Sequence, residues 1–170
     1  DFQELVETVS AEMLLIANAA HDREEAAGRV RAAIRSGAAL AKFSAFVAAQ
    51  GGDARVAEDR TILPAAPVHV KVTAPTGGYV QAIDARAIGL AAVALGGGRQ
   101  KKGEAIDPRV GVMVQAKVGG RVAAGDVLGT IHAADETSAR WVIDRLIEAY
   151  TLQTQPAQTL PILLDRIASS

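Results

Sequence analysis

Apolar side chains recur every three or four residues through positions 1–52, the spacing of one face of a helix. On the first predicted helix these positions are Leu5, Val9, Met13, Ile16 and Ala20. Asp22 and Glu25 have the spacing of a capping box, in which both side chains accept hydrogen bonds at a helix start. They predict a second helix that ends at Gly37, and a third helix follows it. We therefore expect residues 1–52 to form a helical segment.

The pattern changes after residue 52, where positions 53–67 carry prolines and aspartates without a lasting period and predict a linker. From Val68 apolar and polar residues alternate, which is typical of a half-buried strand. A turn at 75–78 and a return strand at 79–83 follow, and further strands are predicted at 110–114 and within 118–131. Residues 137–150 have helical spacing, and 151–154 predict an edge strand. We therefore expect residues 68–170 to form an α+β domain with a non-sequential strand order.

The stretch 82–103 predicts a buried helix, because its positions after Arg86 offer no polar face. Gly96, Gly97 and Gly98 end this helix, since glycine enters positive-φ conformations without penalty. Arg99, Lys101 and Lys102 then follow on a flexible loop. A basic loop behind a buried helix is the most distinctive local feature of the chain.

Composition restricts the possible functions. The net charge of −1 gives no bulk attraction for nucleic acid, and the absence of cysteine excludes disulfides and thiolate sites. No apolar run has the length of a membrane span, and no signal peptide is recognised, so we expect a cytoplasmic protein without a membrane partner. The chain begins at Asp1 inside a predicted helix and contains only 4% aromatic residues. We therefore expect it to be the C-terminal part of something longer.

Several segments together carry a family resemblance. Residues 118–131 fit the pattern V-G-x-x-V-x-x-G-D-x-L-x-x-I of a β-hammerhead hairpin. With GYVQAIDARAIGLAAVALGGGR and the later AIDPRVGV, they closely resemble the C-terminal domain of the pyrimidine nucleoside phosphorylases, the thymidine phosphorylase family. Upstream, GDARVAEDRTILPAA resembles the connector of that family, and VSAEMLLIANAA resembles the last helices of its large domain. The resemblance implies an α/β-hammerhead, barrel-sandwich-like domain after the helical segment.

The resemblance also implies a reaction. Members of this family use inorganic phosphate to split thymidine, deoxyuridine or uridine into the free base and a (deoxy)ribose 1-phosphate. They are homodimers whose substrates lie between a small helical domain and a large α/β domain. The Ser-Gly-Arg-Gly and Thr-Gly-Gly-Thr segments of the family have no counterpart here. We therefore expect no catalytic residue and no cofactor in this chain, which alone should be inert.

The loop formed by Gly96, Gly97, Gly98, Arg99 and Lys101 is the one candidate functional site. A phosphate cradle is disfavoured, because the glycines follow the helix and its C-terminal end carries partial negative charge. Two interpretations stay open: a plain helix stop with a solvated basic loop, or a flexible edge of the substrate cleft that orders on closure.

Two other functional classes remain as alternatives. A biotin or lipoyl carrier would need a lysine at the tip of the 118–131 hairpin, and Lys117 precedes that hairpin instead. A non-enzymatic interaction module is the second, because the apolar face of the first helix is wider than one neighbour requires. His21, His69 and His132 are spread along the chain without ligand partners at helical spacing, so we expect no metal site. His132 and Asp135 are the least implausible acid–base pair.

Overall fold

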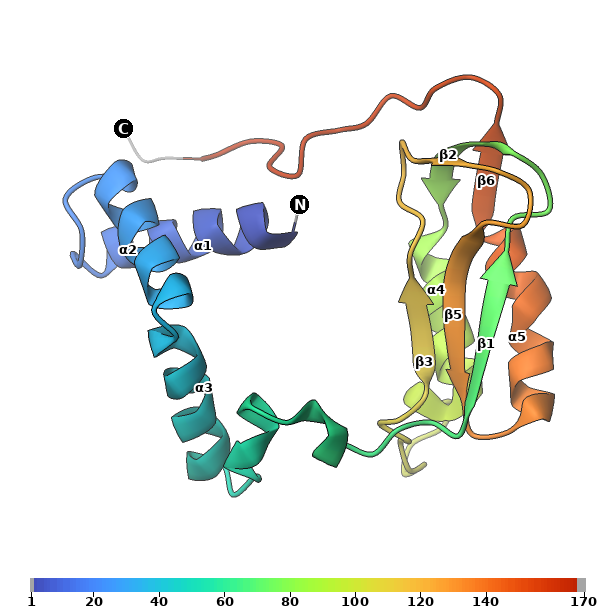
Figure 1. Ribbon diagram of the computed structural model, residues 1–170, viewed down its shortest axis with the longest axis horizontal. Helices are drawn as coiled ribbons and strands as arrows, with labels where there is room; N and C mark the ends of the chain where they lie inside the picture. Colours follow the sequence, from blue (N-terminus) through green and yellow to red (C-terminus); the bar gives the residue numbers. More distant parts are fainter. Residues whose placement is uncertain (1, 168–170) are drawn as a thin grey trace. The chain divides into compact units, whose positions relative to one another are not determined.

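A computed structural model describes residues 2–167 of the chain (Figure 1). Contacts divide these residues into two compact units. Unit 1 comprises residues 2–63 together with 160–167, and unit 2 comprises Pro64–Thr159. Residues 160–167 therefore group with unit 1, whereas the sequence pattern assigned all of 68–170 to one domain. The division of the sequence into a helical segment at 1–52, a linker at 53–67 and a domain at 68–170 stays a prediction.

Unit 1 is built from helices, as the apolar spacing predicts. Its three α-helices and two following 3₁₀ turns are α1 (Phe2–Ile16), α2 (Arg23–Arg35), α3 (Ala38–Ala49), η1 (Ala54–Ala57) and η2 (Arg60–Ile62). Gly37 lies between α2 and α3 with φ +79°, a left-handed conformation that glycine adopts without strain. The predicted linker thus contains short helical turns, each capped by an aspartate, Asp53 and Asp59.

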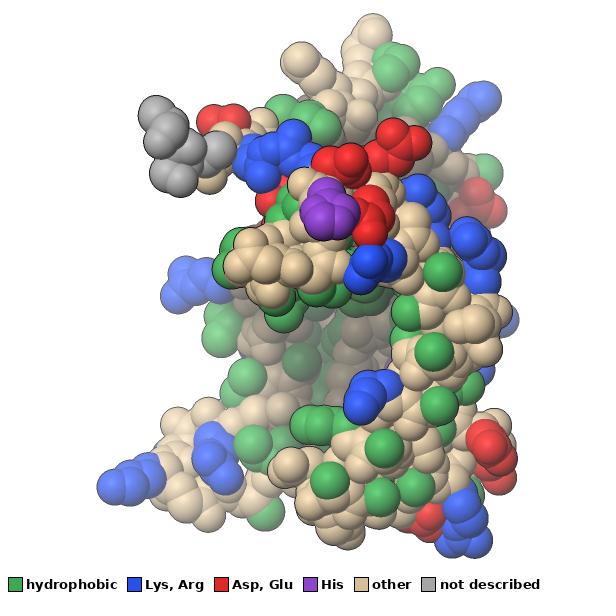
Figure 2. All heavy atoms as spheres, turned by 90° about the vertical axis from the view of Figure 1, so that its left-hand side faces the viewer, with side chains coloured by type: hydrophobic (Ala, Val, Ile, Leu, Met, Phe, Trp, Pro, Cys, Tyr) green, Lys and Arg blue, Asp and Glu red, His purple; other side chains and the backbone are tan. Residues whose placement is uncertain are grey.

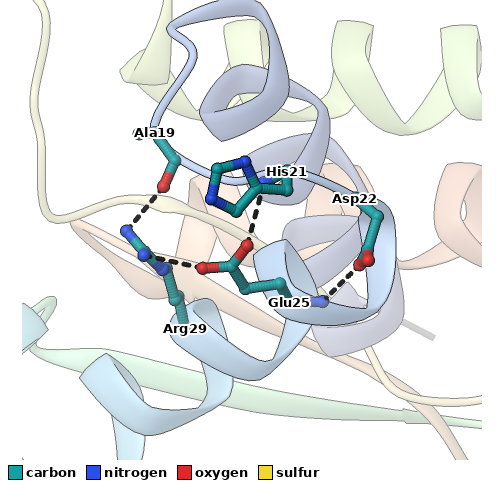
Figure 3. A network of polar contacts seen from close by, with 5 residues as sticks. All are labelled: Ala19, His21, Asp22, Glu25 and Arg29. Carbon is teal, nitrogen blue, oxygen red and sulfur yellow. Dashed lines mark hydrogen bonds and ion pairs between the residues drawn. The ribbon is translucent and has the colours of Figure 1, made fainter.

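The start of α2 is held by the predicted capping box, shown in Figure 3. Asp22 Oδ1 accepts a hydrogen bond of 2.9 Å from the backbone amide of Glu25. Glu25 Oε2 in turn accepts one of 2.9 Å from the amide of His21, one residue before the cap. Arg29 donates to the other Glu25 oxygen at 2.7 Å and to the carbonyl of Ala19. The hydrogen bond from His21 is the main reason why the pKa of Glu25 lies below its ordinary value.

Unit 1 buries little of its apolar surface, and Figure 2 shows hydrophobic side chains at the surface of its helices. Its buried hydrophobic residues among those described are only Ala11 and Ala26. Large exposed side chains include Phe2, Met13, Ile16, Phe43 and Phe46. Within residues 2–167 no single helix has the length and apolar character to span a membrane; α2 and α3, bent by 70°, satisfy those criteria only as a pair.

Unit 2 contains two three-stranded antiparallel sheets. The first has the order β1 (Val68–Thr73), β5 (Val127–Ala133), β3 (Gly111–Val114). The second has the order β4 (Arg121–Val122), β2 (Gly78–Ile83), β6 (Tyr150–Gln153). All the predicted strands are present, the order is non-sequential, and β6 is an edge strand as predicted.

Two predicted pairings are wrong, although the α+β class is confirmed. β2 is not the return strand of β1, because β1 pairs with β5 and β2 pairs with β4 and β6. β4 and β5 do not form one hairpin, because the chain changes sheet between Val122 and Val127. The described residues therefore form two open three-stranded sheets and no closed barrel.

Two helices complete unit 2 and lie against the β1–β5–β3 sheet (Figure 1). They are α4 (Ala85–Ala92), which continues into the π-type turn η3 (Val93–Gly97), and α5 (Glu136–Glu148). The predicted stripe of α5 is confirmed, because Val142 and Leu146 are fully buried against Leu128 and Ile131 in one core cluster. The Tyr150 hydroxyl donates to the carbonyl of Leu128 at 2.8 Å and ties the two sheets together.

The prediction of a buried helix in 82–103 is only partly correct. Ala91 and Leu95 are buried, whereas Leu90 is 52% exposed. Ile83 belongs to β2 and not to the helix, which begins after the N-cap Asp84. Unit 2 therefore covers only part of the apolar surface of α4. Composition alone could not show which face of the helix is buried and which is exposed.

Candidate functional site

The three glycines of the predicted loop each have a steric reason for being glycine. Gly96 adopts φ +99°, where other residues are strained. A Cβ on Gly97 would lie 3.0 Å from the carbonyl oxygen of Ala92, and one on Gly98 would lie 2.7 Å from Val93 Cγ2. The glycines therefore end the helix and let the chain pass closely over its last turn, as the helix-stop interpretation requires.

Glu104 holds the basic part of this loop. Its Oε2 accepts hydrogen bonds from the backbone amides of Gln100 at 2.8 Å and Lys101 at 3.0 Å. Arg99 Nε donates to the backbone carbonyl of Glu104 at 3.0 Å. Two adjacent amides aimed at one carboxylate oxygen form a small anion-binding turn, and a side chain of this chain already occupies it. The amides are thus not open to an external phosphate in this conformation.

A second carboxylate fixes the return of the loop to β3. The amide of Asp107 donates to the carbonyl of Gly96 at 2.9 Å, which joins the two ends of the loop. The Asp107 carboxylate accepts from the Arg109 guanidinium at 2.9 and 2.8 Å. This charged hydrogen bonding lowers the pKa of Asp107 to about 2. The loop is therefore closed and braced at both ends, a feature that the glycine and lysine content did not indicate.

The hammerhead segment offers no carrier residue. Its turn between β4 and β5 contains Gly125 at φ +90°, and Asp126 Oδ2 accepts a hydrogen bond from the amide of Ala123 at 2.7 Å. Lys117 lies before β4, on the connection from β3. The tip is thus a tight structural turn without a lysine.

The histidines are arranged differently from the prediction. His132 lies within β5, not after it, and stands directly opposite His69 of β1. Their ring centroids are 4.4 Å apart and the rings are tilted by 51°. The pKa of His132 is lowered mainly by partial burial and, to a smaller extent, by repulsion from His69.

Asp135, the suggested partner of His132, is instead the N-cap of α5 and accepts from the amide of Ser138 at 2.8 Å. No group of three or more His, Cys, Asp or Glu side chains that could hold a metal ion occurs within residues 2–167. Sequence reasoning missed the histidine pair because the two residues are far apart in the chain. The only local signal was the alternation around Val68 and Val70, which places His69 on the open face of its strand.

Comparison with known proteins gives a consistent result. Residues 79–153, from β2 to β6, match the family model of the pyrimidine nucleoside phosphorylase C-terminal domain. The chain is 41% identical over 160 residues to the thymidine phosphorylase of Burkholderia cenocepacia strain HI2424, covering 94% of this chain and 36% of the relative. It is 39% identical over 167 residues to the pyrimidine-nucleoside phosphorylase of Staphylococcus haemolyticus, covering 98% and 38%. The corresponding enzyme of Geobacillus stearothermophilus is 38% identical over 168 residues, covering 99% and 39%.

These matches cover nearly the whole chain and so include the helices of unit 1, as the resemblance of residues 9–20 and 52–66 led us to expect. The chain spans little more than a third of the length of the curated relatives that it matches. The predicted family is confirmed, and the carrier alternative is not favoured. The chain corresponds to the C-terminal part of the pyrimidine nucleoside phosphorylase family.

Proposed function

We propose that this chain is the C-terminal portion of a pyrimidine nucleoside phosphorylase that splits thymidine, uridine or deoxyuridine with inorganic phosphate. The observation that carries the proposal is the similarity over 94 to 99% of the chain to relatives named thymidine or pyrimidine-nucleoside phosphorylase. The products are the free base and a (deoxy)ribose 1-phosphate. The complete protein acts as a homodimer in the cytoplasm, with phosphate as its co-substrate and without a cofactor in this portion.

The role of this portion is architectural, and the catalytic residues lie in the part of the polypeptide that it lacks. The exposed apolar side chains of unit 1 support this division. Phe2 is 72% exposed, Met13 is 65% exposed and Phe46 is 60% exposed, although such side chains usually lie in cores or interfaces. A hollow of about 530 Å³ in unit 1 is also lined mainly by apolar side chains, among them Val6, Met13 and Ile34. We assign this surface to contact with the rest of the phosphorylase.

A chimera tests the proposal. Residues 1–170 replace the matching third of the Burkholderia cenocepacia thymidine phosphorylase, and thymine release from thymidine and phosphate is measured. We expect turnover by the chimera and none by residues 1–170 alone or by the relative without its matching third. Phosphorolysis by the isolated chain would contradict the division of roles, and a folded but inactive chimera would contradict the proposed function.

The loop Gly96–Lys101 is proposed to border the substrate cleft. Backbone geometry explains the glycines of this loop but not its basic side chains. These basic side chains therefore support a role at the cleft. In the chimera, Arg99→Ala should lower kcat/KM by about ten-fold, because loops that close over substrate affect binding and turnover together. Arg86→Ala, which removes an exposed arginine from α4, is the matched control and should leave kcat/KM unchanged. Equal values for both variants would leave the loop with its helix-stopping role alone.

A further inference from the structure

The open face of the β1–β5–β3 sheet carries a histidine pair to which the proposed reaction gives no role. His69 and His132 are directly opposite each other on adjacent antiparallel strands, and their ring centroids are 4.4 Å apart. His69 is exposed and His132 is half-buried, so solvent reaches the pair. From this juxtaposition we propose that His69 and His132 chelate a divalent transition-metal ion, Cu²⁺ or Ni²⁺, with water in the remaining positions.

The two rings are close enough for one ion to reach a nitrogen of each. An imidazole nitrogen binds such a metal at about 2.0–2.1 Å, which places the ion about 3.2 Å from the ring centroid. Centroids 4.4 Å apart therefore lie within reach of one shared ion once the side chains have rotated to turn a nitrogen of each ring toward it. Imidazole suits both Cu²⁺ and Ni²⁺, and a given site of this kind binds Cu²⁺ more tightly than Zn²⁺.

The strands beneath the pair hold it in register. On the opposite face, Ile131 and Ala133, the neighbours of His132, are fully buried, and Val70 pairs with Ile131. The register shift between β1 and β5 lies at Val72 and Thr73, away from the histidines. Metal binding therefore requires side-chain rotation and no rearrangement of the backbone.

The surroundings leave room for an ion. Gly111 of β3 is the cross-strand neighbour of His132 on its other side, and a Cβ built on Gly111 would meet nothing within 4 Å. A shallow hollow of about 300 Å³ there is lined by His132, Met113 and Arg109, among others.

Two cationic side chains near the pair affect a bound cation differently. Lys71 follows His69 by two residues on the same face of β1 and opposes a cation. The Arg109 guanidinium is instead engaged by the Asp107 carboxylate.

Calorimetric titration of the untagged 170-residue chain with CuSO₄ or NiCl₂ tests the site. We expect one Cu²⁺ per chain with an electron paramagnetic resonance spectrum showing two imidazole nitrogens. His69→Gln and His132→Gln should each weaken binding by about ten-fold or more, since either change leaves a single protein ligand. His21→Gln, which removes a histidine of unit 1, is the matched control and should bind as the parent does.

Folding of each variant is checked by its urea midpoint, so that loss of structure is not mistaken for loss of a ligand. A second readout is the line broadening that Ni²⁺ causes in nuclear magnetic resonance spectra, which should be confined to residues near the β1–β5 pair. Unchanged affinity in both His69→Gln and His132→Gln would overturn the proposal. Broadening centred on His21, or equal losses in all three variants, would also overturn it.

Discussion

The two units of this chain use similar apolar residues in opposite ways. In unit 2 the core side chains Leu128, Ile131, Val142 and Leu146 are completely buried. In unit 1 the described side chains of comparable size remain partly in solvent, and the buried hydrophobic residues are two alanines, Ala11 and Ala26. Helices of 12 to 15 residues gain most of their stability from packing and not from propensity alone. The contrast indicates that unit 2 completes its own core, whereas the described residues of unit 1 leave much of their apolar surface exposed, the surface that we have proposed to contact the rest of a phosphorylase.

The largest expected effect comes from matched leucine truncations. Leu146 of α5 is fully buried and Leu40 of α3 is 51% exposed. Leu146→Ala should lower the free energy of unfolding by about 2–5 kcal/mol, because it removes apolar contacts and leaves a cavity. Leu40→Ala should change it by about 0.5 kcal/mol or less in the isolated chain. Urea denaturation of both variants measures the difference, and equal losses would contradict the contrast between the units.

Matched glycine substitutions in the two units should change stability in opposite directions, and by less than the truncation of Leu146. A Cβ on Gly129 of β5 would lie 2.8 Å from the carbonyl oxygen of Met113, a backbone atom that cannot easily move. Gly129→Ala should therefore destabilise unit 2 by about 1–3 kcal/mol. Gly28 of α2 has open space around a Cβ, and Gly28→Ala should stabilise the helix by about 0.5–1 kcal/mol. Thermal unfolding of both variants is the check, and a stabilising Gly129→Ala would show that unit 2 packs less tightly than described.

The smallest effect concerns two Asp-x-Arg turns, one in each unit. Asp53 accepts from Arg55 in unit 1 and Asp107 accepts from Arg109 in unit 2, and each pairing lowers the pKa of the carboxyl to about 2. When the pKa of a carboxyl is lower in the folded state than its ordinary value of 3.8, the ionised carboxyl stabilises the fold at pH values above 3.8. This contribution is lost as the pH falls through about 2.

Asp107→Asn should remove that part of the pH dependence from the unfolding of unit 2, and Asp53→Asn should remove it from unit 1. Both turns lie at the surface, so the changes should be small and weakened further by salt. Urea midpoints between about pH 2 and pH 5 provide the measurement. An undiminished pH dependence in Asp107→Asn would assign the acid sensitivity of unit 2 to other carboxyls.

Local patterns predicted most elements of this fold. The alternation at Val68, Val70 and Val72 predicted β1, and the stripe through Val142 and Leu146 predicted the buried face of α5. Such patterns reflect only the repeat of each helix or strand, so they can be recognised without knowing which elements pack against it. They could not show which strands pair, because β1 joins a strand nearly sixty residues later in the chain.

The candidate site shows the same limit. The glycines at 96–98 predicted a helix stop, but nothing local indicated that the carboxylate of Glu104 would occupy the amides of Gln100 and Lys101. The histidine pair also depends on register, because a one-residue shift of β5 would turn His132 to the other face. The packing of the whole unit decides which distant segments pair, and the spacing of apolar residues along the chain does not reveal these pairs.

Hydrogen exchange tests most directly whether the apolar surface of unit 1 belongs against the rest of a phosphorylase. Exchange is compared between residues 1–170 alone and the same residues within the chimera. We predict that amides of α1, α2 and α3 exchange much more slowly in the chimera, because packing of their apolar side chains opposes local opening. Amides of β5 and α5 should be protected equally in both. Equal protection of the unit 1 helices in the two proteins would contradict the account.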